Sequence, residues 1–364
     1  MENTNSLPLT GREVGRECKK AVSRCNFAAF IYLLVAGIAI EILYTAVIIG
    51  LGIAFGEGAT AILADPFWSN VILWSLQILC MYIISYPIFR SLIKHLPKRD
   101  ISEHDNLSFG GFIKVFFATQ ALMLIGSIAA NSVTDLINEK LGIVVEDSTA
   151  ELISGTPIWI VILVVVVIGP IFEELVFRKG FIDAIGNYNS RIAIFISAAS
   201  FALFHGNITQ AIYTFGAGLM LAWVYTKTKN IIYPIALHML INFFGSVPTL
   251  LIADSYDRIM ALPEDTLMGE ITDPQLLADL MKVNAVGYMQ YGFMIVGGIF
   301  LLSMIFGGFF KLNREGEVKI PFFRKLGVLI FNSGTIVFLI YSIANIIIYI
   351  FLPVINQYLE SLGA

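Results

Sequence analysis

The stretch VILVVVVIGPIFEELVFR, residues 161–178, decides the fold class of this chain. Its first eight residues carry no polar side chain, whereas two glutamates and an arginine stand near its end. An apolar run of this kind is typical of a membrane-spanning helix, which needs about 20 mostly apolar residues. Gly169 and Pro170 predict a kink in that helix. A charge at the centre of a membrane helix costs about 2.5–3.5 kcal/mol on insertion scales, so these charges need a physical explanation.

The composition extends this interpretation to the whole chain. Of 364 residues, 57% are hydrophobic and 14% are charged, whereas soluble domains carry about 25% charged residues. The sequence therefore predicts an all-α, polytopic transmembrane helical bundle of about nine spans, with eight as the alternative count. The approximate spans are 26–55, 67–92, 110–133, 157–178, 191–206, 208–226, 230–251, 286–310 and 326–352. The fifth is short, so we expect it to tilt or to cross only part of the membrane.

Positive charge alternates between the connections of these spans. Lys and Arg are concentrated in the N-terminal segment and in the second, fourth, sixth and eighth connections, and the intervening connections are poor in both. By the positive-inside rule this pattern places the N-terminus in the cytoplasm. The predicted parts are a cytoplasmic segment 1–25, N-terminal spans 26–156, a catalytic core 157–250, an acidic extracytoplasmic loop 251–285 and C-terminal spans 286–364.

Three other classes of feature are missing from the sequence. No stripe of Lys and Arg with interleaved aromatic residues is present, so nucleic acid is not an expected partner. Cys18, Cys25 and Cys80 form no CxxC pair, which argues against a disulfide framework or a cysteine zinc site. The polar N-terminus has no early apolar core, so we expect no cleavable signal peptide. The expected partner of the helical bundle is membrane lipid, which surrounds it.

Helix geometry separates the two glutamates. Glu174 and Arg178 are four residues apart with the acid first, the favourable order for an ion pair on one helix face. Glu173 points about 100° away from its neighbour on the 3.6-residue period and has no cation nearby in the sequence. A free carboxylate suits a general base or acid. The sequence therefore predicts a structural role for Glu174 and a chemical role for Glu173.

Two of the four histidines fall inside predicted spans, His205 in FALFHGN and His238 in YPIALHMLINFF. A single histidine in a membrane helix is as often a packing residue as a functional one, but two beside a pair of glutamates make coincidence less common. His238 and Asn242 share one helix face and could stabilise an oxyanion together. Phe201, four residues before His205, can restrain the imidazole ring.

Three motifs therefore stand in sequence order: EELVFR at 173–178, FALFH at 201–205 and HMLIN at 238–242. In order and spacing they resemble the EExxxR, FxxxH and HxxxN signature of the CAAX-protease and bacteriocin-processing family, which includes the type II CAAX prenyl endopeptidases. The resemblance covers roughly 157–250, about a quarter of the chain, and this core follows the pattern throughout.

The resemblance implies an intramembrane endopeptidase that hydrolyses peptide bonds in or beside the membrane. It implies a glutamate-activated water rather than a cofactor. Carried over by position, the site comprises the base Glu173, the water-holding His205, the oxyanion residues His238 and Asn242, and the supporting residues Glu174, Arg178 and Phe201. The expected substrate is a peptide or protein, such as a bacterial peptide precursor, and the expected location is a bacterial cell membrane.

Three alternatives stay open at this point. The first is a zinc-dependent endopeptidase in which Glu173, His205 and His238 bind the metal, although the sequence contains no HExxH motif. The second is a non-catalytic immunity or scaffold protein of the membrane. The third is a proton-coupled transporter, which the lack of inverted repeats disfavours.

The depth of His205 sets a geometric condition on the site. This residue follows Arg191 by about 14 residues, or about 21 Å along a straight helix, whereas Glu173 lies close to the predicted inner end of its span. We therefore expect span five to tilt and the inner end of span four to lie nearer Asn187, which places Glu173 deeper.

Overall fold

The computed structural model describes residues 10–98, 105–143, 145, 153, 155–263, 271–312 and 320–363. Within these ranges all regular structure is helical and no strand occurs. The predicted all-α fold class is therefore confirmed.

The helices fall into three consecutive groups along the chain. Those before the predicted core are α1 (Gly11–Phe55), α2 (Gly58–Ala64), α3 (Pro66–Gln77), η1 (Ile78–Ser85), α4 (Tyr86–Ile93) and α5 (Phe109–Leu141). Those of the core are α7 (Ile158–Ile160), η2 (Val161–Ile168), α8 (Gly169–Glu174), η3 (Leu175–Ile182), α9 (Asp183–Ile185), α10 (Ser190–Phe204), α11 (Ile208–Thr228) and α12 (Ile232–Leu251). The last are α13 (Ala253–Met260), α15 (Pro274–Phe306), α16 (Phe322–Leu329) and α17 (Ser333–Gly363). The three η elements are π-helices.

Eight helices in the described ranges are long and apolar enough to cross a membrane. They match eight of the nine predicted spans. The remaining prediction, at 191–206, corresponds to α10, a shorter apolar helix of 15 residues. The chain is thus a polytopic integral membrane protein with one short helix among its spans.

The first helix begins at Gly11, well before the span start predicted at residue 26. Thr10 and Glu13 form a capping box, because each side chain accepts a hydrogen bond from the main-chain N–H of the other. Val14 and Cys18, one turn apart, are buried against the bundle. From residue 11 onward, the polar segment is therefore an amphipathic extension of the first span.

Two other boundaries differ from the sequence prediction. The fourth span continues to Ile185 instead of ending at residue 178, so Glu173 lies deeper, as the depth of His205 requires. The helix α15 begins at Pro274, well before residue 286, because Asp273 caps its first turn through the N–H of Gln275. Part of the predicted loop 251–285 is therefore helical.

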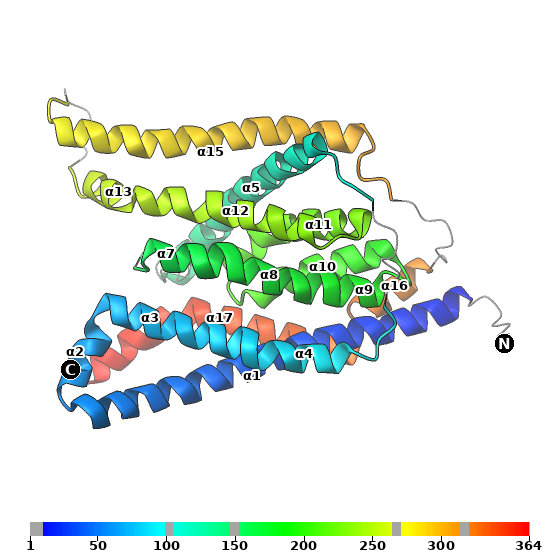
Figure 1. The fold of residues 1–364 in the computed structure, drawn as a ribbon, viewed down its shortest axis with the longest axis horizontal. Coiled ribbons are helices and arrows are strands. Elements are labelled where there is room, and N and C mark those ends of the chain that lie inside the picture. The colour runs from blue at the N-terminus through cyan, green and yellow to red at the C-terminus, as the bar shows by residue number, and fades with distance from the viewer. Residues whose placement is uncertain are drawn as a thin grey trace.

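The connections sort onto the two ends of the bundle as the charge pattern predicted. Figure 1 shows the N-terminus at one end and the C-terminus at the other, with the connections after α4, α9, α11 and α15 at the N-terminal end. The helices α2 and α13 lie at the opposite end. Which end faces the cytoplasm stays a prediction from the positive charge.

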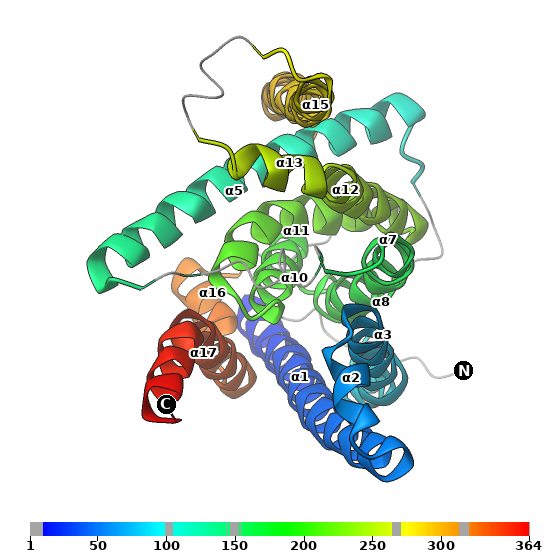
Figure 2. The ribbon, with the colours of Figure 1, turned by 90° about the vertical axis from the view of Figure 1, so that its left-hand side faces the viewer.

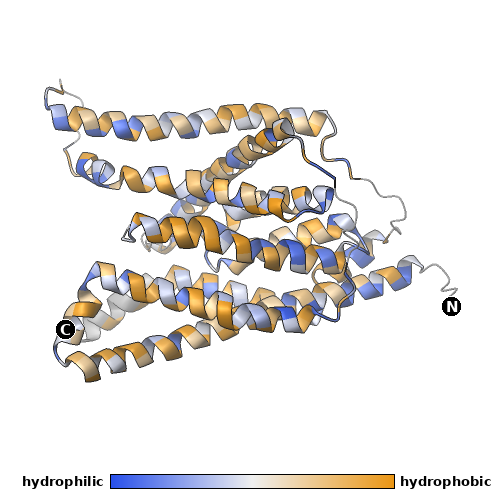
Figure 3. Ribbon diagram, in the orientation of Figure 1, coloured by the Kyte–Doolittle hydropathy of each residue, from blue (hydrophilic) through white to orange (hydrophobic). Residues whose placement is uncertain are grey.

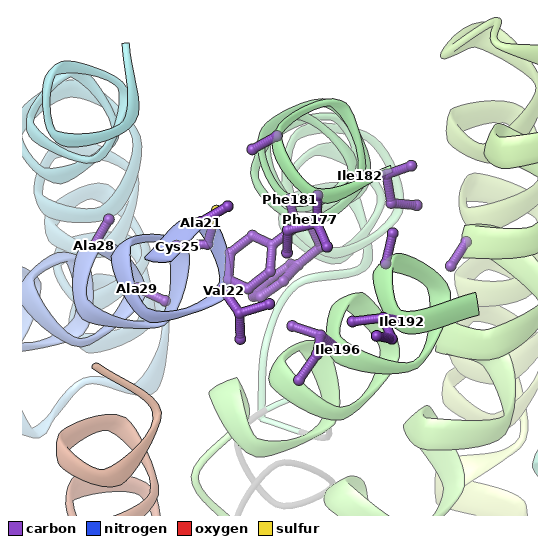
Figure 4. Packing of buried hydrophobic residues seen from close by; sticks show 14 of the residues in the cluster. Ala21, Val22, Cys25, Ala28, Ala29, Phe177, Phe181, Ile182, Ile192 and Ile196 are labelled. Carbon is purple, nitrogen blue, oxygen red and sulfur yellow. The ribbon is translucent and has the colours of Figure 1, made fainter. Parts of the chain in front are cut away.

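The largest core cluster joins α1 to the fourth span and to α10. In Figure 4, the rings of Phe177 and Phe181 reach the face of α1 that carries Ala21, Val22 and Cys25. The small side chains on α1 allow these aromatic rings to approach the helix closely. This packing holds η3, and the glutamates just before it, in a fixed position.

The outer surface of the bundle is strongly apolar. Isoleucine and phenylalanine side chains are exposed along its length, including Ile53 at 83% and Phe306 at 85%. Figure 3 shows hydrophobic residues along the helices and hydrophilic ones mainly near their ends. Exposed apolar area on this scale is typical of a lipid-facing surface, since soluble monomers expose only limited apolar patches.

Candidate active site

The fourth span changes helical register just before its acidic residues. The N–H of Gly169 donates to the carbonyl of Val164, five residues back, which is the π-helical step. In this register the partner of the next carbonyl, Val165, would be the amide of Pro170, and proline has no N–H. The predicted kink is therefore a π-helical segment that leaves the Val165 carbonyl without a partner in its own helix.

The side chain of Asn242 on α12 fills this gap. Its Nδ2 atom donates a 2.8 Å hydrogen bond to the Val165 carbonyl oxygen. An amide nitrogen carries two N–H groups, so this bond fixes the amide and leaves the second N–H available. The structure thus gives Asn242 a contact to the fourth span that the sequence did not reveal.

Glu174 is the centre of a buried charge network. Its side chain is fully buried, with Oε2 lying 2.9 Å from Nε of Arg178 and Oε1 lying 2.9 Å from Nδ1 of His238. The Arg178 side chain is also fully buried. A charge at this depth needs a partner, and each charge of the Glu174–Arg178 pair supplies one for the other.

Arg178 is further held by an aromatic ring and a hydroxyl group. Its guanidinium lies 4.6 Å from the ring centroid of Phe201, in cation–π geometry. Its Nη1 atom is 3.5 Å from Oγ of Ser197, which in turn donates to the carbonyl of Phe177. Lys179 behaves differently, because its side chain is 42% exposed and pairs with Asp183. Of the two adjacent cations, only Arg178 belongs to the network.

Glu173 faces the same histidine from the other side. Its Oε2 atom is 3.6 Å from Nε2 of His238, beyond direct hydrogen-bond distance, and its side chain is 25% exposed. The Glu174 carboxylate can only accept a hydrogen bond, so Nδ1 of His238 carries the proton in that contact. The imidazole is therefore anchored through Nδ1 and presents Nε2 to Glu173.

His205 is anchored in the same way. It follows the last residue of α10, and its Nδ1 atom lies 2.8 Å from the main-chain oxygen of Phe201. A carbonyl only accepts, so Nδ1 is the donor and Nε2 is left for other contacts. The Phe201 ring packs edge-on against both imidazoles, with centroids 4.9 Å from His205 and 5.6 Å from His238. The Phe201 ring therefore helps to set the positions of the two imidazole rings.

Most residues singled out in the sequence are thus brought together. Direct contacts join Glu173, Glu174, Arg178, Phe201 and His238, and His205 joins them through Phe201. No group of three or more His, Cys, Asp or Glu side chains in the described ranges is arranged to hold a metal ion. Sequence reasoning did not identify Ser197 or the Val165 carbonyl. The only signal for the carbonyl was Pro170.

A comparison with known protein families gives a match to this part of the chain. Residues 155–244 match the family described as type II CAAX prenyl endopeptidase Rce1-like. This segment is similar to the Rce1-like CAAX protease family. It contains all three motifs, so the segment that matches the family model is also the part of the chain that builds the charge network.

Two curated relatives from bacteria align with the chain. YdiL of Bacillus subtilis (strain 168), named as a candidate membrane peptidase, is 32% identical over 95 residues. The membrane-embedded CAAX protease MroQ of Staphylococcus aureus (strain USA300) is 38% identical over 92 residues. The matches cover 26% and 23% of this chain and 38% and 37% of those relatives. No solved structure matches. The apolar helices and these relatives identify an integral membrane protein of bacterial type.

Proposed function

We propose that this chain is an intramembrane endopeptidase that hydrolyses peptide bonds with a water activated by Glu173. The observation that carries the proposal is the difference in contacts and exposure between the two glutamates. Glu174 has both oxygens occupied by Arg178 and His238, whereas Glu173 is partly exposed and has no short contact. A general base must be free to reach the proton that it removes, and Glu173 meets that condition.

In the proposed reaction, Glu173 takes a proton from water while the hydroxide attacks the peptide carbonyl carbon. The carbonyl oxygen becomes an oxyanion, which needs hydrogen-bond donors placed in advance. The second N–H of Asn242 is one donor. Nε2 of His238 is another when it carries a proton. Glu173 then returns its proton to the leaving amine as the C–N bond breaks.

The remaining residues position these groups. His205, anchored to the Phe201 carbonyl, directs Nε2 to the water, as the resemblance implies. Arg178 neutralises Glu174 and keeps its oxygen on the His238 ring. We expect the substrate to be a peptide or membrane protein, such as a peptide precursor, because both relatives are named as membrane peptidases or proteases.

The test compares membranes that contain the intact chain with membranes that contain the Glu173→Gln variant. Mass spectrometry of the released peptides and new N-termini should find products that depend on the intact carboxylate. Equal product sets at equal expression would contradict the proposal. A biological effect retained by Glu173→Gln without any cleavage would favour the non-catalytic immunity or scaffold function.

One observation keeps zinc as the second candidate mechanism. Metal-binding histidines almost always donate their other ring N–H to a carboxylate or carbonyl, and both His205 and His238 make such a bond. Glu173 would be the third ligand, although within the described ranges these three side chains are not arranged as a metal site. Activity measured after stringent chelation, with metal content of the purified protein, separates the mechanisms. Unchanged turnover supports the unaided glutamate, and loss that zinc restores supports the metal.

A further inference from the structure

The proposed oxyanion site includes one donor that depends on protonation. The Nδ1 proton of His238 is directed to Glu174, so Nε2 carries a second proton only in the charged form of the ring. The neutral ring presents a lone pair there instead. A tyrosine hydroxyl, by contrast, donates a hydrogen bond in its ordinary neutral form.

Tyr82 on η1 places a hydroxyl group beside the fourth span. Its ring stacks on Phe172, the residue before Glu173, with centroids 4.5 Å apart and an interplanar angle of 19°. Tyr86 packs edge-on against the same Phe172 ring at 5.1 Å. Two tyrosines therefore hold Phe172, and the first is fixed directly beside the start of the acidic pair.

The Tyr82 hydroxyl and the Glu173 carboxylate converge over Gly169. A Cβ atom built on Gly169 would lie 3.1 Å from the main-chain oxygen of Val164, 3.4 Å from the Tyr82 hydroxyl oxygen and 3.8 Å from Oε1 of Glu173. The hydroxyl and carboxylate oxygens thus lie within 4 Å of one point. Any other residue at this position would place its Cβ between these oxygens, so glycine lets the Tyr82 hydroxyl and the Glu173 carboxylate approach each other.

The Tyr82 hydroxyl is available for such a role. The residue is 7% exposed, and within the described ranges its hydroxyl makes no hydrogen bond to protein. Buried tyrosines usually find a hydrogen-bond partner. The Tyr82 hydroxyl oxygen is not among the fully buried polar atoms without a partner, so it is an accessible donor beside the base of the proposed reaction. A donor in this place points to a partner that the substrate supplies.

We propose that Tyr82 is a further oxyanion donor of this site, and the inference rests on the proposed function. When the hydroxide from water forms its bond to the carbonyl carbon, the electron pair of the C=O bond moves to oxygen. That oxygen accepts a hydrogen bond from the Tyr82 hydroxyl, and Tyr82 keeps its proton.

The experiment uses Tyr82→Phe in the full chain, which removes one oxygen and keeps the ring on Phe172. The probe is a fluorogenic peptide that copies a cleavage site mapped in the membrane comparison. We expect kcat to fall by about 10²–10³, the usual effect of losing one oxyanion donor. We expect KM and the unfolding temperature to stay near wild-type values, because the stacking is unchanged.

Tyr86→Phe is the matched control, since it also removes a hydroxyl from a ring that contacts Phe172, and it should keep wild-type kcat. Wild-type kcat in Tyr82→Phe, with Glu173→Gln inactive, would overturn the role of Tyr82 and leave the proposed function standing. A raised KM at unchanged kcat would also overturn it. Full activity in Glu173→Gln would instead remove the proposed function, and this inference with it.

Discussion

The amide of Asn242 and the carbonyl of Val165, 77 residues apart in sequence, are joined by a 2.8 Å hydrogen bond. The bond exists because Pro170 supplies no N–H in the π-helical register of the fourth span. A carbonyl in a membrane interior has little water to replace a lost partner. Asn242 therefore stabilises the span that carries the glutamates, in addition to its proposed part in the reaction.

The first prediction concerns this bond. Asn242→Ala leaves the Val165 carbonyl without a donor, which should cost about 1–3 kcal/mol of folding stability. Loss of the second N–H should lower turnover by about 10²–10³. Thermal unfolding and the cleavage assay measure the two effects. Ser246→Ala, which removes a bond within α12 to the Asn242 carbonyl, is the control and should change both quantities little. An unchanged unfolding temperature in Asn242→Ala would contradict the structural role.

Glu173→Gln is expected to separate chemistry from folding. The substitution keeps the size of the side chain but removes the base. Because Glu173 is 25% exposed and makes no short contact, the unfolding temperature should stay within a few degrees of the wild-type value while cleavage falls to background. Measurable turnover at the wild-type rate would assign the base to another residue.

Glu174→Gln should fail in the opposite way, although the two residues are adjacent. It leaves Arg178 buried without its ion partner, and breaking a buried pair costs about 3–5 kcal/mol. It also weakens the anchor of His238. Expression in the membrane and the unfolding temperature should therefore fall together with activity. Wild-type stability in this variant would show that the ion pair contributes little.

A double variant tests the pair itself. Glu174→Gln combined with Arg178→Met removes both buried charges, and replacing a buried pair with uncharged groups is often neutral for stability. We expect the double variant to recover most of the stability lost in Glu174→Gln, yet to remain inactive because His238 has lost its carboxylate. If the double variant is less stable than either single variant, the cation–π contact with Phe201 carries more of the energy.

Cysteine labelling tests the orientation of the bundle. The native Cys18, Cys25 and Cys80 are buried, so the wild-type chain should serve as an unlabelled background. An impermeant thiol reagent added outside should modify Asp257→Cys on α13 and leave Lys311→Cys unmodified until the membrane is opened; both residues are exposed. The reverse labelling result would show the opposite orientation, with the connections rich in Lys and Arg outside the cell.

The sequence predicted those features that depend on local patterns. Hydropathy and charge gave the helical class, the spans and the two-ended arrangement, and helix periodicity separated Glu173 from Glu174. The sequence did not reveal the π-helical register, because that register depends on which carbonyl oxygen accepts the hydrogen bond of each main-chain N–H. Nor could it show the bond from Asn242 to Val165 or the place of Tyr82 on Phe172, since both are contacts between distant segments.

The short helix α10 affects whether the chain crosses the membrane an even or an odd number of times. End on, Figure 2 places it among longer helices, and it packs against α11, η3, α1 and α17. Its 15 residues span about 22 Å, less than the hydrocarbon core of about 30 Å, but neighbouring helices rather than lipid absorb the mismatch. Eight crossings would return the C-terminus to its starting face. A ninth crossing, made by α10, would reverse the orientation of every segment after it.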